Sequence, residues 1–249
     1  MCGRFVLKAP ALQLRTTFAV EDAFDYPPRF NIAPMQPVGV IVPESGQRRF
    51  RLMRWGFMPA WVKDPAQFSL IINARAETAS GKPAFRAAMR HRRCIIPADG
   101  FYEWQARGAT KQPYFIAPRD GRVMAFAALC ETWAGPHGEE VDTVAILTVA
   151  ASADMRALHE RMPAILDPDA LNLWLDCARV DALTAQALLQ PRASGFLQWH
   201  PVSRDVNRTA NDGAHLIAAV ADIEPPPAQP AKTIKRTRPR ASPDQSSLF

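Results

Sequence analysis

The sequence lacks an apolar run of about 18 residues, and its opening segment, Met1–Phe5, carries no apolar stretch of the kind found in signal peptides. We therefore expect no membrane span and a cytoplasmic location. Cysteine is scarce as well, with four residues at positions 2, 94, 130 and 177. No C-x-x-C motif and no histidine pair at zinc spacing occurs, so we expect neither a metal site nor a redox dithiol.

Charge is unevenly spread along the chain. The 249 residues carry a net charge of +6, of which +4 falls in the 25 residues after Glu224. The body is therefore close to neutral, and the basic balance by itself does not indicate a nucleic-acid-binding surface there. With 48% hydrophobic residues, the chain as a whole is too apolar to be disordered.

The pattern of the body predicts an α+β fold. Short β-branched runs alternate with amphipathic segments, which favours a single domain with a curled, mostly antiparallel, barrel-like sheet and flanking helices. Hairpins are expected for 38–42 with 48–54 and for 114–117 with 123–129, and further strands at 94–96 and 141–149. Helices are expected at 9–18, 82–91, 153–161, 167–176 and 181–189.

A run of three prolines after Glu224 marks the domain boundary. The following residues are rich in Pro, Lys, Arg and Ser and cannot form a core of their own. We therefore expect a domain over residues 2–224 and a disordered, basic tail over 225–249.

Cys2 is the sharpest chemical feature. Once Met1 is removed, its α-amine and thiol form a 1,2-aminothiol, which condenses with an aldehyde to a five-membered thiazolidine. Ring closure is intramolecular and gains a large effective molarity. The α-amine titrates near 7.7–8.0, well below lysine, so more of it is neutral at pH 7. The alternative is that Cys2 only begins a strand.

Four further residues have the chemistry for a site. His159 can exchange protons at neutral pH, and Glu103 lies among aromatic residues, where desolvation suits a carboxylate to proton transfer. Asn73 and Arg75 share a face if their segment is extended, and could hold a polar ligand or a phosphate. Each also has a purely structural interpretation, as a surface histidine, an ion-paired carboxylate or a buried hydrogen-bonded network.

Two tryptophans bracket a Gly- and Pro-containing segment at 56–60. An exposed aromatic ring in such a loop can stack on an unpaired base. Of the two, we expect Trp55 to be structural and Trp61 to be the stacking residue.

Taken together, several segments resemble one known family, the SOS-response-associated peptidase (SRAP) family. They are Met1–Phe5, Arg29–Pro34, Trp55–Pro59, Asn73–Thr78, Arg93–Trp104, His159–Pro163, and Pro201–Ser203 with Val206 and Asn207. The resemblance runs from Cys2 to about Ile217 and excludes the tail.

The resemblance implies a function at abasic sites in single-stranded DNA. Proteins of this family couple their N-terminal cysteine to the aldehyde of an abasic sugar, forming a DNA–protein cross-link without any cofactor. By matching positions, Cys2 would supply both nucleophiles, and Asn73 would orient the Cys2 amine and the sugar. Glu103 would handle protons at the amine and the imine, and His159 would assist sugar ring opening and reversal of the adduct.

The resemblance also implies which residues contact DNA and which enzyme class the protein belongs to. Phosphates would be held by Arg4, Arg75 and Arg161, with Thr148 as a weaker candidate, and Trp61 would stack on a base. The family name reflects an older proteolytic interpretation, so a peptidase, hydrolase or lyase class is implied. A monomer is expected.

The last five residues are similar to the bacterial sliding-clamp-binding motif. Gln245 is followed by the terminal apolar pair Leu248 and Phe249. On a flexible tether, such anchors would raise the local concentration of the protein at replicating DNA. The alternative is a C-terminus without a partner.

Two other functions remain open at this stage. N-terminal-nucleophile amidohydrolases also present a Cys-Gly start, but their oxyanion hole uses an Asn-Gly pair, which this sequence lacks. A non-catalytic single-strand-binding module, with an inert Cys2, is the other alternative.

Overall fold

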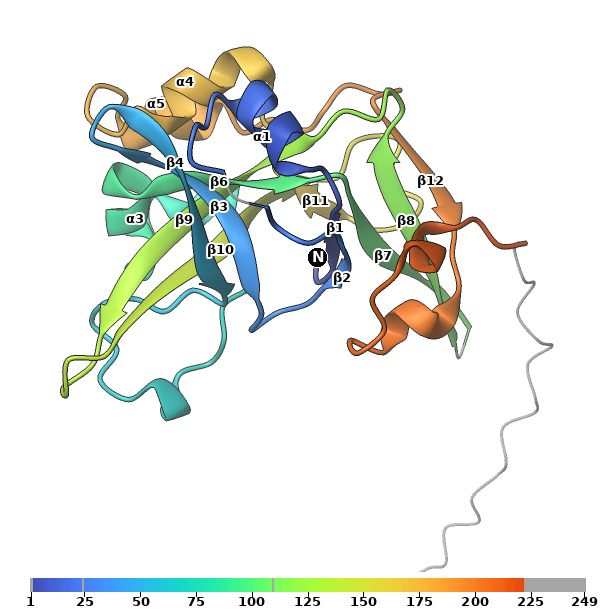
Figure 1. Ribbon diagram of the computed structural model, residues 1–249, viewed down its shortest axis with the longest axis horizontal. Helices are drawn as coiled ribbons and strands as arrows, with labels where there is room; N and C mark the ends of the chain where they lie inside the picture. Colours follow the sequence, from blue (N-terminus) through green and yellow to red (C-terminus); the bar gives the residue numbers. More distant parts are fainter. Residues whose placement is uncertain (1, 24, 109, 222–249) are drawn as a thin grey trace, which may run out of the picture.

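A five-stranded antiparallel sheet forms one of the two β-layers of the molecule (Figure 1). The computed structural model describes residues 2–23, 25–108 and 110–221. The strands of this sheet follow the order β12-β8-β7-β1-β2. Their bounds are β1 Phe5–Leu7, β2 Arg29–Ile32, β7 Gly100–Arg107, β8 Thr110–Pro118 and β12 Leu197–Pro201.

The second layer closes on itself as a barrel. Strands β10, β4, β3, β6 and β9 pair in that order, and β9 pairs back onto β10. All these pairs are antiparallel except β10 with β4. The bounds are β3 Pro37–Glu44, β4 Gln47–Trp55, β6 Arg93–Ala98, β9 Met124–Ala134 and β10 Glu140–Ala150. Closure pairs both edges of the sheet, which a small β protein otherwise has to protect.

Two short strands extend the barrel at the end of β10. Strand β5, Asn73–Arg75, pairs in parallel with Ile146–Thr148, and β11, Arg161–Pro163, pairs antiparallel with Thr148–Ala150. Two sequence segments almost 90 residues apart are thereby brought to the same stretch of β10.

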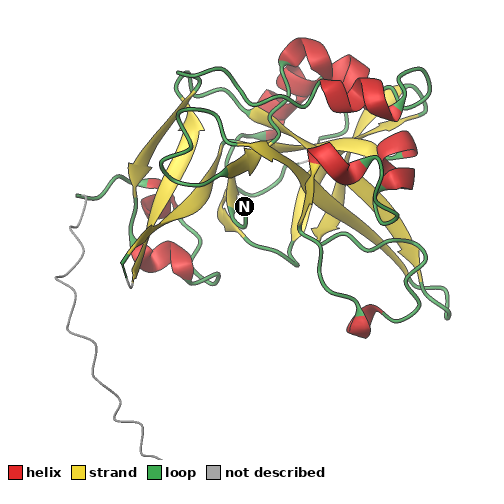
Figure 2. Cartoon of the chain, turned by 180° about the vertical axis from the view of Figure 1, so that it is seen from behind, coloured by secondary structure: helices red, strands yellow, loops and turns green. Residues whose placement is uncertain are grey.

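Aromatic packing joins the sheet to the barrel. Phe5 of β1 contacts the Trp55 ring edge-on with centroids 5.2 Å apart, and the Phe126 ring at 6.2 Å. All three side chains are buried. Because Phe5 is anchored in both layers, the chain before it lies between them, and both views place the N-terminus there (Figure 2).

The helices are short and peripheral. They are α1 Ala11–Phe18, α2 Ala76–Ala79, α3 Arg86–His91, α4 Leu171–Leu175 and α5 Ala182–Ala187, with 3-10 turns η1 Pro65–Gln67, η2 Pro168–Ala170, η3 Arg204–Asn207 and η4 Ala214–Ile217. Buried Arg93 holds the α4–α5 region on β6 by donating to the carbonyls of Met89, Trp174, Asp176 and Val180 at 2.7–2.8 Å.

The predicted fold class is confirmed, and so is the hairpin of β3 and β4. Its turn residues Ser45 and Gly46 have φ of 50° and 78°, as a two-residue hairpin turn requires. Strands at 94–96 and 141–149 are found within β6 and β10. Of the helices, α1 matches closely, whereas 82–91 contains a helix only from Arg86.

Two expected elements are wrong. Strands β8 and β9 do not form a hairpin, because β8 pairs with β7 and β12 in the sheet whereas β9 joins the barrel. The turn at Gly121 does form, but it passes the chain from one layer to the other. The segment 153–161 is a series of turns and not a helix. The Ala151 amide donates to the Glu160 carbonyl at 2.9 Å across this segment, and the chain then enters β11. The tail after Glu224 lies outside the described residues.

Candidate functional site

Cys2 lies at the junction of the two layers and is fully buried. Its carbonyl accepts a hydrogen bond of 2.8 Å from Asn73 Nδ2 on β5 of the barrel. Its thiol donates to the Arg4 carbonyl at 3.7 Å, and that carbonyl also accepts from the Tyr102 amide on β7 of the sheet at 3.0 Å. The N-terminal segment is therefore held from both sides.

The side chain of Glu103 on β7 is only 4% exposed, and its negative charge acts on the Cys2 thiol. Burial of the thiol, followed by the negative charge of Glu103, raises the pKa of Cys2 far above its ordinary value. The thiol is thus protonated at neutral pH, with a carboxylate near it that can accept a proton.

The two polar atoms of the Asn73 side chain differ in their hydrogen bonding. Its Nδ2 is bonded to Cys2, while its Oδ1 is buried and has no hydrogen-bond partner among the described residues. Because β5 is extended, Arg75 falls on the same face two residues later, and its side chain is exposed. Asn73 and Arg75 therefore present an acceptor and a cation in one direction.

His159 precedes β11 and is half-buried. Its Nδ1 accepts from the Arg161 amide at 2.9 Å. Nδ1 also lies 3.2 Å from the Arg161 carbonyl, so the shorter contact favours a proton on Nε2, whereas the longer one would suit a proton on Nδ1. Gln105 of β7 donates to the Ala157 carbonyl at 3.0 Å, which ties the histidine loop to the strand that carries Glu103.

The Arg161 side chain is hydrogen-bonded to Glu77 and Thr148. It makes a two-pronged ion pair with Glu77, at 2.6 and 2.9 Å, and donates to the carbonyl and hydroxyl of Thr148 at 2.5 and 3.3 Å. Thr148 is fully buried. Burial favours a positioning role for Thr148 over the direct phosphate contact expected from the sequence.

Arg4 is partly buried and is built into the sheet. Its Nη1 donates to Asn31 Oδ1 at 3.0 Å and to the Val206 carbonyl at 2.8 Å, and its guanidinium lies 5.9 Å from the Trp104 ring centroid. Asn31 is fully buried and had no role in the sequence analysis, although it lies within one of the matching motifs. Phe30 and Ile32 alternate with Arg29 and Asn31 in β2, so a polar residue is ordinary at position 31 and the pattern gave no signal of its burial.

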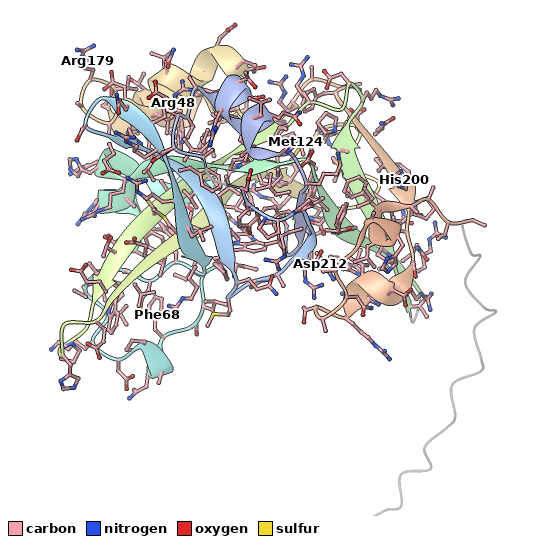
Figure 3. All side chains as sticks on the ribbon, in the orientation of Figure 1. Arg48, Phe68, Met124, Arg179, His200 and Asp212 are labelled. Atoms are coloured by element: carbon pink, nitrogen blue, oxygen red, sulfur yellow. The ribbon has the colours of Figure 1, made fainter. Side chains whose placement is uncertain are left out.

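The two tryptophans behave as expected. Trp55 is fully buried and donates from Nε1 to the Ile72 carbonyl at 2.9 Å. Trp61 is 61% exposed and leans edge-on against Phe68, with ring centroids 5.9 Å apart. Figure 3 shows Phe68 on the loop that projects from the barrel. Trp61 is therefore available for stacking.

The described part of the chain contains no group of three or more His, Cys, Asp or Glu residues arranged to hold a metal ion. Within the same residues, no helix is long and apolar enough to cross a membrane. Gln245, Leu248 and Phe249 lie outside the described residues.

The junction of barrel and sheet thus holds Cys2 by the amide of Asn73, with the charge of Glu103 acting on its thiol. Residues 1–209 match the family described as SOS response associated peptidase (SRAP), and the chain belongs to this family.

Relatives align over most of the chain. The abasic site processing protein YoqW of Bacillus subtilis is 37% identical over 221 residues, covering 87% of this chain and 99% of YoqW. The abasic site processing protein YedK of Escherichia coli is 32% identical over 231 residues, covering 88% and 100%. A protein from Bacteroides thetaiotaomicron of known crystal structure has the same fold, with a TM-score of 0.78 at 22% identity, covering 88% and 100%.

Proposed function

We propose that this protein processes abasic sites in single-stranded DNA by linking its N-terminal cysteine to the abasic sugar as a thiazolidine. One observation carries the proposal: Cys2 is held by Asn73 at 2.8 Å beside the buried carboxylate of Glu103. An aminothiol fixed between a hydrogen-bonding amide and a proton acceptor suits condensation with an aldehyde. The names of the relatives YoqW and YedK agree with this substrate.

The reaction begins on the sugar and the α-amine. Ring opening places a proton on O4′ and removes the one on the C1′ hydroxyl: His159 would donate the first from its ring and take up the second through water, so that no proton is gained or lost. With Met1 removed, the Cys2 amine adds to the C1′ aldehyde, and the carbinolamine loses one water to give an imine. Asn73 keeps the Cys2 backbone, and hence its amine, in place.

Ring closure involves the thiol. Cys2 Sγ forms a bond to the imine carbon, and the thiol proton ends on the ring nitrogen. The raised pKa keeps the thiol protonated until this step, so Glu103 serves as the relay that accepts and returns the proton. The net change is the loss of one water, and reversal follows the same steps backwards with His159 again assisting.

Cations and an aromatic ring would hold the strand. Arg75 is exposed, and Arg4 retains donors beyond those bonded to Asn31 and Val206, so both can bind phosphates. Arg161 would contribute through its network with Glu77, and Trp61 would stack on a base. Phosphate contacts carry no sequence information, which suits a protein that acts at any lesion.

The test is intact-protein mass spectrometry after incubation with a single-stranded oligonucleotide carrying one abasic site. The expected mass is that of the Met1-less protein plus DNA minus one water, mapped to Cys2. Cys2→Ala is expected to lose this adduct, which survives SDS, while keeping non-covalent binding. Ammonia release from glutamine without an adduct would instead identify an amidohydrolase, and binding without an adduct a single-strand-binding module.

We further propose that the C-terminal residues Gln245, Leu248 and Phe249 bind the bacterial sliding clamp. In this proposal Leu248 and Phe249 are the two apolar anchors for a groove of the clamp, and the number of residues after the domain allows it to remain on DNA. Deletion of Leu248 and Phe249 is expected to abolish binding to purified clamp. Unchanged binding after the deletion, or none by the intact chain, would refute this interaction.

A further inference from the structure

Residues 206–211, the end of η3 and the turn after it, form a segment, here called the 206–211 loop, that is held by several hydrogen bonds to one side chain. The Nδ2 group of Asn31 lies 3.2, 3.0 and 2.9 Å from the carbonyls of Val206, Arg208 and Asn211. Asn31 is fully buried, so these hydrogen bonds are shielded from water. The backbone of the loop is therefore fixed by one side chain of β2.

The same side chain holds Arg4. The oxygen of Asn31 accepts from Arg4 Nη1 at 3.0 Å, and Arg4 also donates to the Val206 carbonyl at 2.8 Å. Trp104, whose ring lies against Arg4, donates to Asn207 Oδ1 at 2.8 Å. The 206–211 loop is thus built against the cation that begins the proposed DNA path.

The loop presents an uncompensated cation. Arg208 is exposed, and its side chain has no hydrogen bond or ion pair among the described residues. Two acidic residues flank the loop: Asp205 accepts from the Ser203 hydroxyl at 2.9 Å, and Asp212 is taken by Arg29 at 2.6 Å and by the Phe30 amide at 2.5 Å. Asn211 Nδ2 also secures the loop on the Asp205 carbonyl at 2.8 Å. A positive side chain on a rigid base next to Arg4 suits a polyanion.

We propose that the 206–211 loop is a second DNA-binding element, in which Arg208 contacts a phosphate of the single strand beyond the one held by Arg4. This inference rests on the proposed function, because it takes the strand to pass Arg4. The contact is sequence-independent and adds affinity without entering the chemistry at Cys2.

The test measures binding of undamaged, fluorescein-labelled single-stranded DNA by anisotropy over a range of salt concentrations. Arg208→Ala is expected to weaken affinity about 3- to 10-fold at low salt and to reduce the slope of log K against log salt by about 0.7, as loss of one phosphate contact does. Arg208→Lys is expected to recover most of both. Since the side chain is exposed, neither substitution should change the thermal midpoint.

The matched control is Arg179→Ala. Arg179 is also exposed and its loss changes the charge equally, but Figure 3 places it at the upper left edge of the molecule, away from Asp212. Equal effects of the Arg179 and Arg208 substitutions would overturn the inference, because only net charge would then matter. Failure of the proposed function has another signature: normal binding by the unaltered protein with no covalent adduct.

Discussion

Glu77 and Arg161 face each other as a two-pronged ion pair, with oxygen-to-nitrogen distances of 2.6 and 2.9 Å. Glu77 follows β5, and Arg161 begins β11, so the pair joins the strand of Asn73 to the loop of His159. Arg161 also donates to the Thr148 carbonyl on β10, which lies between the two strands. The Arg161 guanidinium therefore links the segment that contains Asn73 to the segment that contains His159.

The first prediction concerns the stability that this pair supplies. Arg161 lowers the pKa of Glu77 below its usual 4.5, so the stabilisation is complete above pH 4.5 and is lost as pH falls through the lowered value. Because the Glu77 side chain is 51% exposed, Glu77→Gln is expected to cost less than about 1 kcal/mol at neutral pH. Urea unfolding at pH 7 and in steps below pH 4.5 measures it.

Glu160→Gln provides the control for that measurement. Glu160 is exposed and has no ion pair within the described part of the chain. Its substitution is expected to leave the free energy of unfolding unchanged at every pH. A Glu77→Gln effect that persists undiminished in acid would show that the loss is not electrostatic.

The second prediction concerns the reactivity of the Cys2 thiol. The thiolate is the reactive form, and burial together with the charge of Glu103 raises the pKa of Cys2. Alkylation by iodoacetamide, followed on the N-terminal peptide by mass spectrometry, is expected to remain slow from pH 7 to pH 9, where free cysteine becomes reactive. Glu103→Gln removes one cause and is expected to increase the rate at pH 9. A profile with a midpoint near 8.5 would contradict the prediction.

The third prediction separates the chemistry of His159 from binding. General acid catalysis contributes about 10²-fold or more, so His159→Ala is expected to slow adduct formation, release or both by that order. Non-covalent affinity for intact single-stranded DNA is expected to stay within about twofold, since the phosphate contacts are assigned to arginines and not to His159. His215→Ala, at an exposed position, is the control. Unaltered rates in both directions would remove His159 from the mechanism.

The fourth prediction concerns stacking by Trp61. Because the ring is 61% exposed, Trp61→Ala is expected to leave the thermal midpoint unchanged while weakening single-strand binding by about 1–3 kcal/mol. Trp61→Phe is expected to retain much of the affinity. The control is Leu12→Ala on α1, where a 72% exposed apolar side chain is lost from a helix that carries none of the proposed DNA contacts. Equal affinity of Trp61→Ala and the unaltered protein would exclude stacking.

Local patterns predicted local structure well. The hairpin of β3 and β4 follows from its turn chemistry, and β10 from its β-branched run. The hairpin expected around Gly121 failed because a turn sets only the direction of the chain. Which strands pair afterwards depends on the apolar surface that each can bury, and β8 and β9 find theirs in different layers.

The sequence by itself determined the family and singled out the candidate site residues, because Cys2, Asn73, Glu103 and His159 each lie in a recognisable motif. Only the tertiary structure decided how these motifs meet. Asn73 reaches Cys2 because β5 adds to β10, and Glu103 does so because β1 pairs with β7. The structure also revealed Asn31 as a support of Arg4 and the commitment of Arg161 to Glu77. Hydrogen bonds and ion pairs between distant segments exist only once both layers are packed, so no local pattern could predict them.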